Sequence, residues 1–297
     1  MSISFDFGIF TSPYFDTSVL IYAAIVGVLT SICASVLGVS LVLKRYSMIG
    51  DGLSHVGFLA LAIAAVLGIT GDAVMYVTVP VVTLSAFLLM WLSESGRLKG
   101  DAATALVSVG TVAVGYIIFS IARTGSADVC AGLFGSSILT LKNTDLVLSV
   151  AFSAVILGLY IIFSKKIFAV TFDENFAKSA GVNVRGCNLL ISVMTAVTVV
   201  VGMKLIGSIM ISAVIVIPAV TAMRISSRFK NVVLLSSAIS AICFILGFVF
   251  AVTFVLTIDE GAAGETVMLP VGATIVIFNI IALLIACVYK KLRHKKA

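Results

Sequence analysis

A carboxylate and an imidazole stand four residues apart at the start of a long apolar stretch, as Asp51 and His55. If that stretch is helical, positions i and i+4 share one face, so the two side chains point the same way. Ionisable side chains inside an apolar segment usually serve a function. One oxygen donor and one nitrogen donor suit zinc, manganese or ferrous iron. The pair is therefore a candidate metal site.

One Asp and one His supply only half of a tetrahedral metal shell. A second copy of the chain, with the dimer axis beside this helix, would supply the other two donors. The alternative is structural: Asp51 would cap or charge the helix N-terminus, and His55 would bond to it one turn later. Basic residues directly before the pair place it near an expected membrane edge. It reaches membrane depth only if the connection 44–50 folds back into the protein.

The elements that position this pair are expected to be membrane helices. Of the 297 residues, 61% are hydrophobic and 11% are charged, and the mean hydropathy is +1.25. A soluble domain with so few charged residues could not cover its surface. Because a bilayer core of roughly 30 Å requires about 20 apolar residues per helix, we expect an all-α polytopic membrane protein with a single domain, 1–297. The apolar stretches predict about nine transmembrane helices, near 18–43, 51–69, 73–92, 102–121, 146–163, 187–202, 205–223, 232–256 and 268–289.

An eight-helix version, in which 187–223 does not cross the membrane twice, fits the charges less well. With the N-terminus outside, 16 of the 19 Lys and Arg residues fall in one set of loops and in the tail 290–297. The opposite set of loops carries Arg123, Lys142 and Lys204. Cytoplasmic loops carry an excess of Lys and Arg, so the richer set and the C-terminal tail are expected in the cytoplasm. The net charge of +6 is explained by this orientation, and we expect no nucleic-acid partner.

The predicted cytoplasmic connection at 164–186 contains a candidate docking helix. Thr171 could cap its N-terminus, and Asp173 and Glu174 would then occupy its first turn. Gly181 could end it, because glycine readily adopts the left-handed conformation that follows many helices.

One face of this short helix is expected to be apolar. Phe172, Phe176 and Ala180 recur at four-residue intervals, which is the helical spacing. An amphipathic helix held at the cytoplasmic surface lies on lipid or docks into a groove of a partner. The acidic first turn disfavours an anionic lipid surface, so the pattern favours a protein partner.

Several classes of function lack their motifs in this sequence. There is no phosphate-binding loop, so we expect no ATP hydrolysis by this chain, and there is no G-x-S-x-G or H-E-x-x-H motif. A secondary metal/proton antiporter is the alternative from a different class, but it normally buries several ionisable groups. Beyond Asp51 and His55, the apolar stretches are almost free of such groups, which favours an energy source outside the membrane domain.

Four ordered motifs resemble the permease subunits of bacterial zinc/manganese/iron ABC importers, and together they cover nearly the whole chain. They are Arg45-Tyr-Ser-Met-Ile-Gly-Asp-Gly-Leu-Ser-His55, Leu133-Phe-Gly-Ser136, the segment 172–181, and the segment 202–222. The resemblance implies a permease with the type II ABC-importer fold in the bacterial cytoplasmic membrane. It also implies three partners: a second copy of the chain, a cytoplasmic ATPase dimer, and an extracytoplasmic protein that delivers the metal.

The resemblance also implies roles for individual residues. Asp51 and His55 would bind the transported ion, and no cofactor would be bound permanently. The first and third motifs are more similar to the zinc permeases, whereas the absence of a histidine at 107–110 counts against zinc. Manganese and iron therefore stay open. A separate hypothesis is that Arg123 and Lys142 help to dock an acidic lobe of the binding protein. The ATPase-coupling residues would be Phe172, Asp173, Glu174, Phe176, Ala177 and Gly181.

Overall fold

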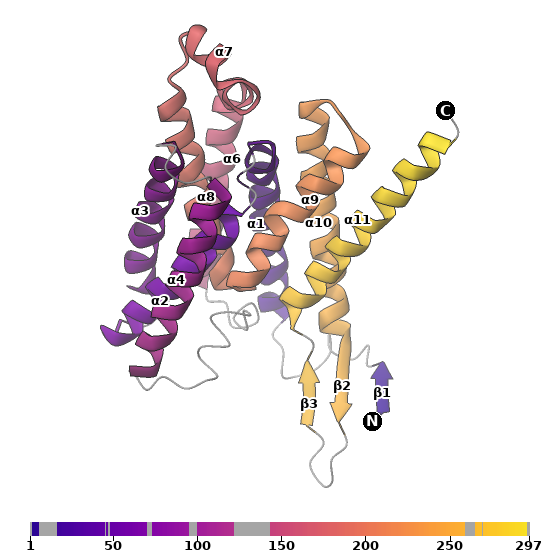
Figure 1. The fold of residues 1–297 in the computed structure, drawn as a ribbon. Helices are drawn as coiled ribbons and strands as arrows, with labels where there is room; N and C mark the ends of the chain where they lie inside the picture. Colours follow the sequence, from indigo (N-terminus) through magenta and orange to yellow (C-terminus); the bar gives the residue numbers. More distant parts are fainter. Residues whose placement is uncertain are drawn as a thin grey trace.

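The computed structural model describes residues 2–5, 17–44, 46, 48–69, 73–94, 100–121, 143–258, 265–268 and 270–295. Within these ranges, nine long helices form a bundle and one short helix, α7 (Glu174–Ser179), caps one end of it (Figure 1). The long helices are α1 (Thr17–Leu43), α2 (Ile49–Val66), α3 (Val74–Glu94), α4 (Gly100–Ile121), α6 (Asn143–Phe172), α8 (Val184–Ile206), α9 (Ser208–Ile225), α10 (Phe229–Thr253) and α11 (Val271–Lys295).

Each of the nine predicted stretches falls on one of these helices. Seven of the helices are long and apolar enough to cross a membrane, and α3 and α9 hold shorter apolar segments, Val74–Leu89 and Met210–Ile225. The C-terminal end of α11 lies at the same end of the bundle as α7, and strand β1 (Ser2–Phe5) lies at the opposite end (Figure 1). An odd number of crossings places the two termini in this way.

A small antiparallel sheet was not predicted from the sequence. Strands β2 (Phe254–Ile258) and β3 (Glu265–Met268) form a hairpin, and β1 pairs with β2, which gives the order β1-β2-β3. Strand β2 could not be predicted because its residues continue the apolar run of α10 without a break. A short apolar run does not distinguish helix from strand. The predicted all-α membrane bundle therefore carries, in addition, one small sheet that the prediction did not include.

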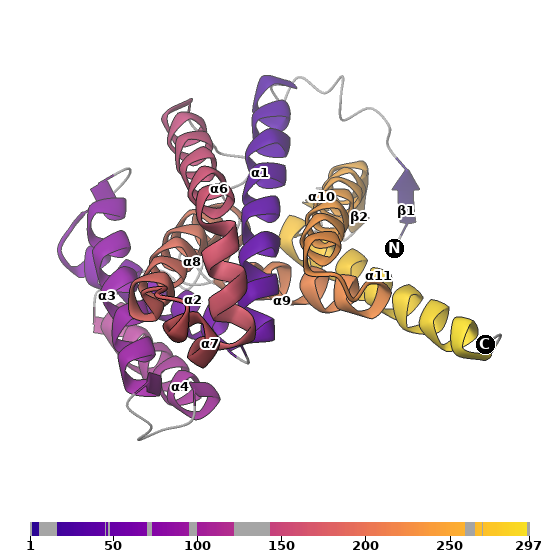
Figure 2. The same ribbon diagram turned by 90° about the horizontal axis from the view of Figure 1, so that it is seen from above.

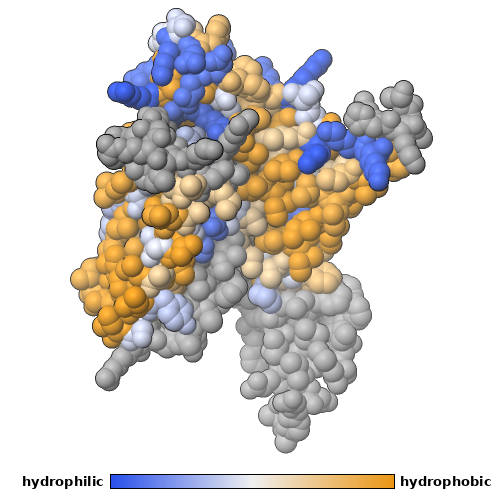
Figure 3. Space-filling model, viewed as in Figure 1, coloured by the Kyte–Doolittle hydropathy of each residue, from blue (hydrophilic) through white to orange (hydrophobic). Residues whose placement is uncertain are grey.

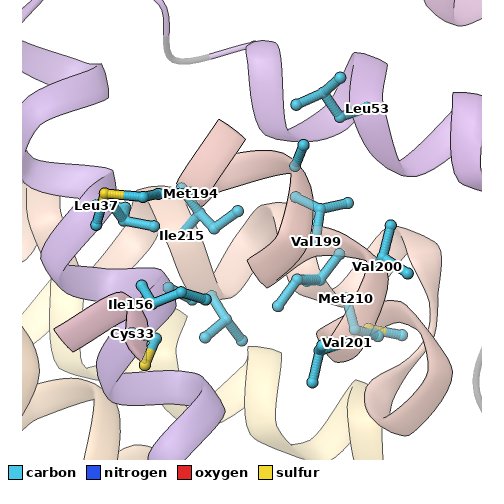
Figure 4. Close-up of a cluster of buried hydrophobic side chains, with 14 of the residues drawn as sticks. Cys33, Leu37, Leu53, Ile156, Met194, Val199, Val200, Val201, Met210 and Ile215 are labelled. Atoms are coloured by element: carbon cyan, nitrogen blue, oxygen red, sulfur yellow. The ribbon is translucent and has the colours of Figure 1, made fainter. Parts of the chain in front are cut away.

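The core lies where α1 meets the other helices. Helix α1 contacts α6, α8, α9 and α10. Figure 4 shows buried side chains of the same hydrophobic cluster from α1, α2, α6, α8 and α9, among them Leu37, Leu53 and Ile215. Gly38 allows a close approach of two backbones, because a Cβ atom there would lie 1.9 Å from the carbonyl oxygen of Ile215 in α9. Small residues at helix contacts let membrane helices pack backbone to backbone.

A single residue, Gly207, separates α8 from α9, and the chain turns sharply there (Figure 1). Its φ of 101° lies in the region that favours glycine, so this residue type makes the turn possible. Pro218 lies inside α9.

The surface matches a bundle embedded in lipid. Hydrophobic side chains cover much of the described part of the helices in Figure 3, and hydrophilic side chains gather around α7 and the C-terminal end of α11. The polar cap and the apolar belt below it are typical of membrane helices that emerge into water.

Candidate functional site

The start of α2 lies inside the bundle. The backbone N–H of Tyr46 donates to the carbonyl oxygen of Leu41 at 2.9 Å, so the chain turns back immediately after α1. Gly50 then lies against the side chain of Ile215, the residue that also meets Gly38 of α1. Gly38 precedes the end of α1 by five residues, which is roughly 8 Å along a helix. The first turn of α2 therefore packs against α9 near the last turns of α1, inside the bundle.

Asp51 and His55 lie on one face of α2, as their spacing predicted. The imidazole Nε2 is 3.5 Å from Oδ1 of Asp51, and the hydroxyl of Ser108 in α4 donates to Oδ2 of the same carboxylate at 3.3 Å. The other imidazole nitrogen, Nδ1, is buried and has no hydrogen-bond partner among the described residues. The side chain of His55 is 17% exposed and that of Asp51 is 36% exposed. Protein atoms therefore cover most of the pair, and solvent still reaches part of it.

Asp51 does not cap α2. The N-cap position is Met48, which makes no side-chain capping bond, and Asp51 lies in the first helical turn. That position still favours a negative charge, because the N-terminal end of a helix is electropositive. The capping interpretation of Asp51 was therefore wrong, while the contact between Asp51 and His55 one turn apart is confirmed.

Helix α4 approaches α2 closely beside this pair. A Cβ atom on Gly52 would lie 2.6 Å from Cγ2 of Thr104, so the glycine lets the two helices meet. This contact brings Ser108, one turn further along α4, to the carboxylate. Sequence reasoning missed Ser108, since a serine in an apolar helix carries no spacing signal that links it to a residue 57 positions away.

One copy of the chain offers an incomplete metal shell. Among the described residues, no group of three or more His, Cys, Asp or Glu side chains could hold an ion. Asp51 and His55 supply one oxygen and one nitrogen, and the Ser108 hydroxyl is a neutral oxygen close to them. A tetrahedral site needs two further donors from outside this copy.

The short helix α7 begins two residues later than predicted. Oδ1 of Asp173 accepts the backbone N–H groups of Asn175 at 2.9 Å and Phe176 at 3.0 Å, which makes Asp173 the N-cap. Thr171 instead donates to the carbonyl oxygen of Ile167 inside α6, because α6 continues to Phe172. The prediction that Thr171 caps this helix was wrong.

The end of α7 and its buried face can also be compared with the sequence. Gly181 follows the helix with a φ of 76°, as predicted for its C-terminal end. The buried residue is Ala177, which packs against a small cluster with Val170 and Val184. Phe176 is 67% exposed, whereas Phe172 belongs to α6 and packs against Phe168 and Phe229. Only part of the predicted apolar face is therefore free of contacts with the rest of the described chain. An exposed phenylalanine on a polar cap is a candidate contact for a partner.

An ion pair ties α7 to the end of α1. Nζ of Lys44 lies 3.1 Å from Oε1 of Glu174, and the Asn188 side chain contacts both groups. Burial raises the pKa of the Glu174 carboxyl, but the hydrogen bond and the charge of Lys44, with smaller contributions from Asn188 and Lys178, outweigh it and hold that pKa below its usual range. No local pattern in the sequence indicates this contact, which joins residues 130 positions apart.

Three of the predicted features lie outside the described residues. They are Arg123 and Lys142, expected to dock a binding protein, and the motif Leu133-Phe-Gly-Ser136. Their roles stay predictions.

Comparisons with known proteins agree with one another. Residues 16–290 match the model of the ABC 3 transport family. The manganese transport system membrane protein MntC of Listeria innocua is 27% identical over 257 residues, which cover 86% of this chain and 87% of that protein. The high-affinity zinc uptake system membrane protein ZnuB of Haemophilus influenzae is 25% identical over 252 residues, 84% of this chain and 93% of that protein. The solved structure of PsaBC from Streptococcus pneumoniae in complex with Fab aligns with a TM-score of 0.73 and 28% identity over 90% of each chain.

Proposed function

The chain belongs to the ABC 3 transport family as a membrane transport subunit rather than an ATPase, and from this premise we propose that it imports a divalent transition metal ion into a bacterial cell. The observation that supports this most directly is the Asp51/His55 pair, turned toward α4 and held inside the bundle. Relatives that cover most of the chain are named for manganese and zinc transport. Membership in an ABC transport family also argues against the alternative function of a secondary metal/proton antiporter.

The import route would run between two copies of the chain. Each copy brings one carboxylate and one imidazole, so two copies bring the four donors of a tetrahedral ion. Donors shared across a moving interface can be brought together in one state and separated in the next, which releases the ion. The Nδ1 atom of His55, buried and without a partner in the described residues, is free to accept a contact from the second copy or from the ion.

Energy would come from a cytoplasmic ATPase dimer that docks on α7. The exposed Phe176 is the apolar anchor on this helix, and the Lys44–Glu174 pair connects the helix to the end of α1. Lys44 precedes Ile49, the first residue of α2, by five positions, and α2 carries the Asp51/His55 pair. A displacement of α7 would therefore shift the start of α2, and with it Asp51, through the Lys44–Glu174 pair. A binding protein would deliver the ion at the opposite, extracytoplasmic end.

Zinc is the first candidate for the transported ion. Four donors from two copies fit the tetrahedral preference of zinc, whereas manganese favours six ligands rich in oxygen. Manganese is the second candidate because Ser108 adds one oxygen beside each carboxylate, which would raise the two-copy total to six. Iron remains a third ion that the same donors can bind.

The proposal is tested by metal accumulation in cells that express the chain with its ATPase and binding protein. Zinc, manganese and iron are offered together to cells carrying the wild type, Asp51→Ala or His55→Ala. Both variants are expected to lose accumulation of the physiological metal. Thr195→Val is the matched control, because it removes a buried hydroxyl that bonds only within α8. Accumulation by the double variant at the level of the wild type would refute the proposed route.

A further inference from the structure

A cavity of about 750 Å³ opens between the end of α6 and the start of α10, at the end of the bundle that carries α7. Figure 2 shows α1 lying between these two helices. The cavity falls in the size range of small-molecule binding sites. It is separate from the Asp51/His55 pair, and neither residue lines it.

Three cationic side chains line this cavity: Lys165 from α6, Arg228 immediately before α10, and Lys230 from the first turn of α10. Of the described residues that line it, none is acidic. The first turn of α10 forms part of the wall, and the N-terminal turn of a helix favours an anion through its backbone N–H groups. Charge therefore selects an anionic occupant.

The remaining wall is apolar. The rings of Phe168 and Phe229 lie 5.0 Å apart, and Val233 and Leu234 extend the wall along α10. Leu234 is 68% exposed, so the apolar side continues onto the outer face of the helix, where lipid tails would lie. A small soluble anion would make no use of such a wall. Cations above an apolar surface, at the end of membrane helices, match the headgroup and upper chain of a phospholipid.

We propose that this cavity binds one anionic phospholipid from the cytoplasmic leaflet, with its phosphate among Lys165, Arg228 and Lys230 and its chain along Leu234. The assignment rests on the orientation in which α7 faces the cytoplasm, and it does not depend on which metal is transported. The occupied site would also brace the coupling helix. Phe172, the residue before the α7 cap, packs against Phe168 and Phe229 with ring centroids 4.8 and 5.9 Å away.

The test measures lipid retained by the purified full-length chain. Wild type is equilibrated with equal amounts of phosphatidylglycerol and phosphatidylethanolamine, and the bound lipid is counted by native mass spectrometry. We expect anionic lipid to be preferred by about tenfold or more, since each cation near a charged lipid surface contributes substantially to binding. The triple variant Lys165→Gln, Arg228→Gln, Lys230→Gln is expected to lose this preference, and the single variant Arg228→Gln to lose part of it.

A matched control removes three cations from the same end of the bundle. Lys166→Gln, Lys290→Gln, Lys291→Gln changes the total charge equally, and these exposed residues do not line the cavity. The control is expected to keep the preference. Equal loss in both triple variants, or no preference in the wild type, would overturn the proposal because binding would then be diffuse or absent.

Two further measurements distinguish lipid from other occupants. An excess of glycerol 3-phosphate is expected to leave the bound lipid in place, and displacement would reassign the cavity to a soluble phosphate. A photo-crosslinking residue at Leu234, in the chain assembled with its ATPase, is expected to capture lipid. Capture of the ATPase instead would make the cavity part of a protein interface and overturn the lipid assignment. Neither readout requires transport, so a failure here leaves the proposed import function intact.

Discussion

Lys44 and Glu174 form an ion pair with 3.1 Å between Nζ and Oε1, although they come from the end of α1 and the first residue of α7. The lysine side chain is 7% exposed and the glutamate 46%, so the contact is anchored on the α1 side and open on the α7 side. Five residues after Lys44 the chain has already entered α2. This pair is thus one described link between α7, the proposed coupling helix, and the start of the helix that carries Asp51.

Breaking this pair should uncouple ATP hydrolysis from transport more than it destabilises the fold. A partly exposed ion pair contributes about 1 kcal/mol or less, so Lys44→Met should fold, while metal import per ATP hydrolysed falls severalfold. The double variant Lys44→Glu, Glu174→Lys should recover part of the loss because it restores the attraction. Uptake and hydrolysis are measured together in proteoliposomes. Lys166→Met serves as the control cation, and an unchanged coupling ratio in Lys44→Met would show that the pair transmits nothing.

The same pair predicts a pH dependence of stability. The pKa of Glu174 is lowered in the folded chain from its ordinary value of 4.5. A carboxyl with a lowered pKa stabilises the fold fully above its ordinary value, and the contribution disappears as pH falls through the lowered value. The difference in melting temperature between wild type and Glu174→Gln should therefore stay constant from about pH 8 to about pH 5 and shrink only at more acidic pH. A difference that already vanishes near neutral pH would contradict this account.

The sequence was sufficient to predict the helices because their apolar runs are long and the basic residues mark their ends. It also predicted the shared face of Asp51 and His55, since that depends on local spacing alone. Contacts between distant segments could not be predicted: Ser108 meets Asp51, and Lys44 meets Glu174, only because helix packing brings them together.

The errors at helix ends come from neighbouring residues that suit the same position and from a helix–strand boundary without a change in composition. Thr171 and Asp173 both suit an N-cap, and the sequence does not reveal that α6 continues past Thr171. Strand β2 follows α10 directly and shares its apolar composition, so the boundary at Thr253 had no signal.

Gly38 should tolerate no side chain. A Cβ atom there would lie 1.9 Å from the Ile215 carbonyl oxygen, a backbone atom that cannot rotate away. Gly38→Ala should therefore destabilise the chain by about 1–3 kcal/mol, the usual cost of overpacking a core. Gly158→Ala in α6 is the matched control, since nothing lies within 4 Å of its added Cβ, and it should be neutral or slightly stabilising. Thermal unfolding of both purified variants measures this, and equal melting temperatures would refute the close contact.

Phe176 should matter for assembly with the ATPase and little for the fold. Its side chain is 67% exposed on α7, so Phe176→Ala removes few contacts within the chain. If it fills a groove of the partner, the variant should lose most of the ATPase that co-purifies with the wild type. Phe87→Ala in α3, where the side chain is 49% exposed, is the control for loss of an exposed ring. Retention of the ATPase by Phe176→Ala would remove this residue from the docking surface.

Ser108 offers a way to distinguish the two leading metals. Its hydroxyl donates to Oδ2 of Asp51 at 3.3 Å, which leaves it beside the carboxylate that would bind the ion. Zinc is satisfied by four donors, which Asp51 and His55 from two copies supply, whereas manganese favours six and would draw on oxygens nearby. Ser108→Ala should therefore reduce manganese uptake severalfold and leave zinc uptake within about twofold of the wild type. The measurement is initial uptake of each metal alone, with Thr111→Val as a control that removes a hydroxyl bonded only within α4. Equal losses for both metals would mean that Ser108 acts only by orienting Asp51, and the donor count would then not explain metal choice.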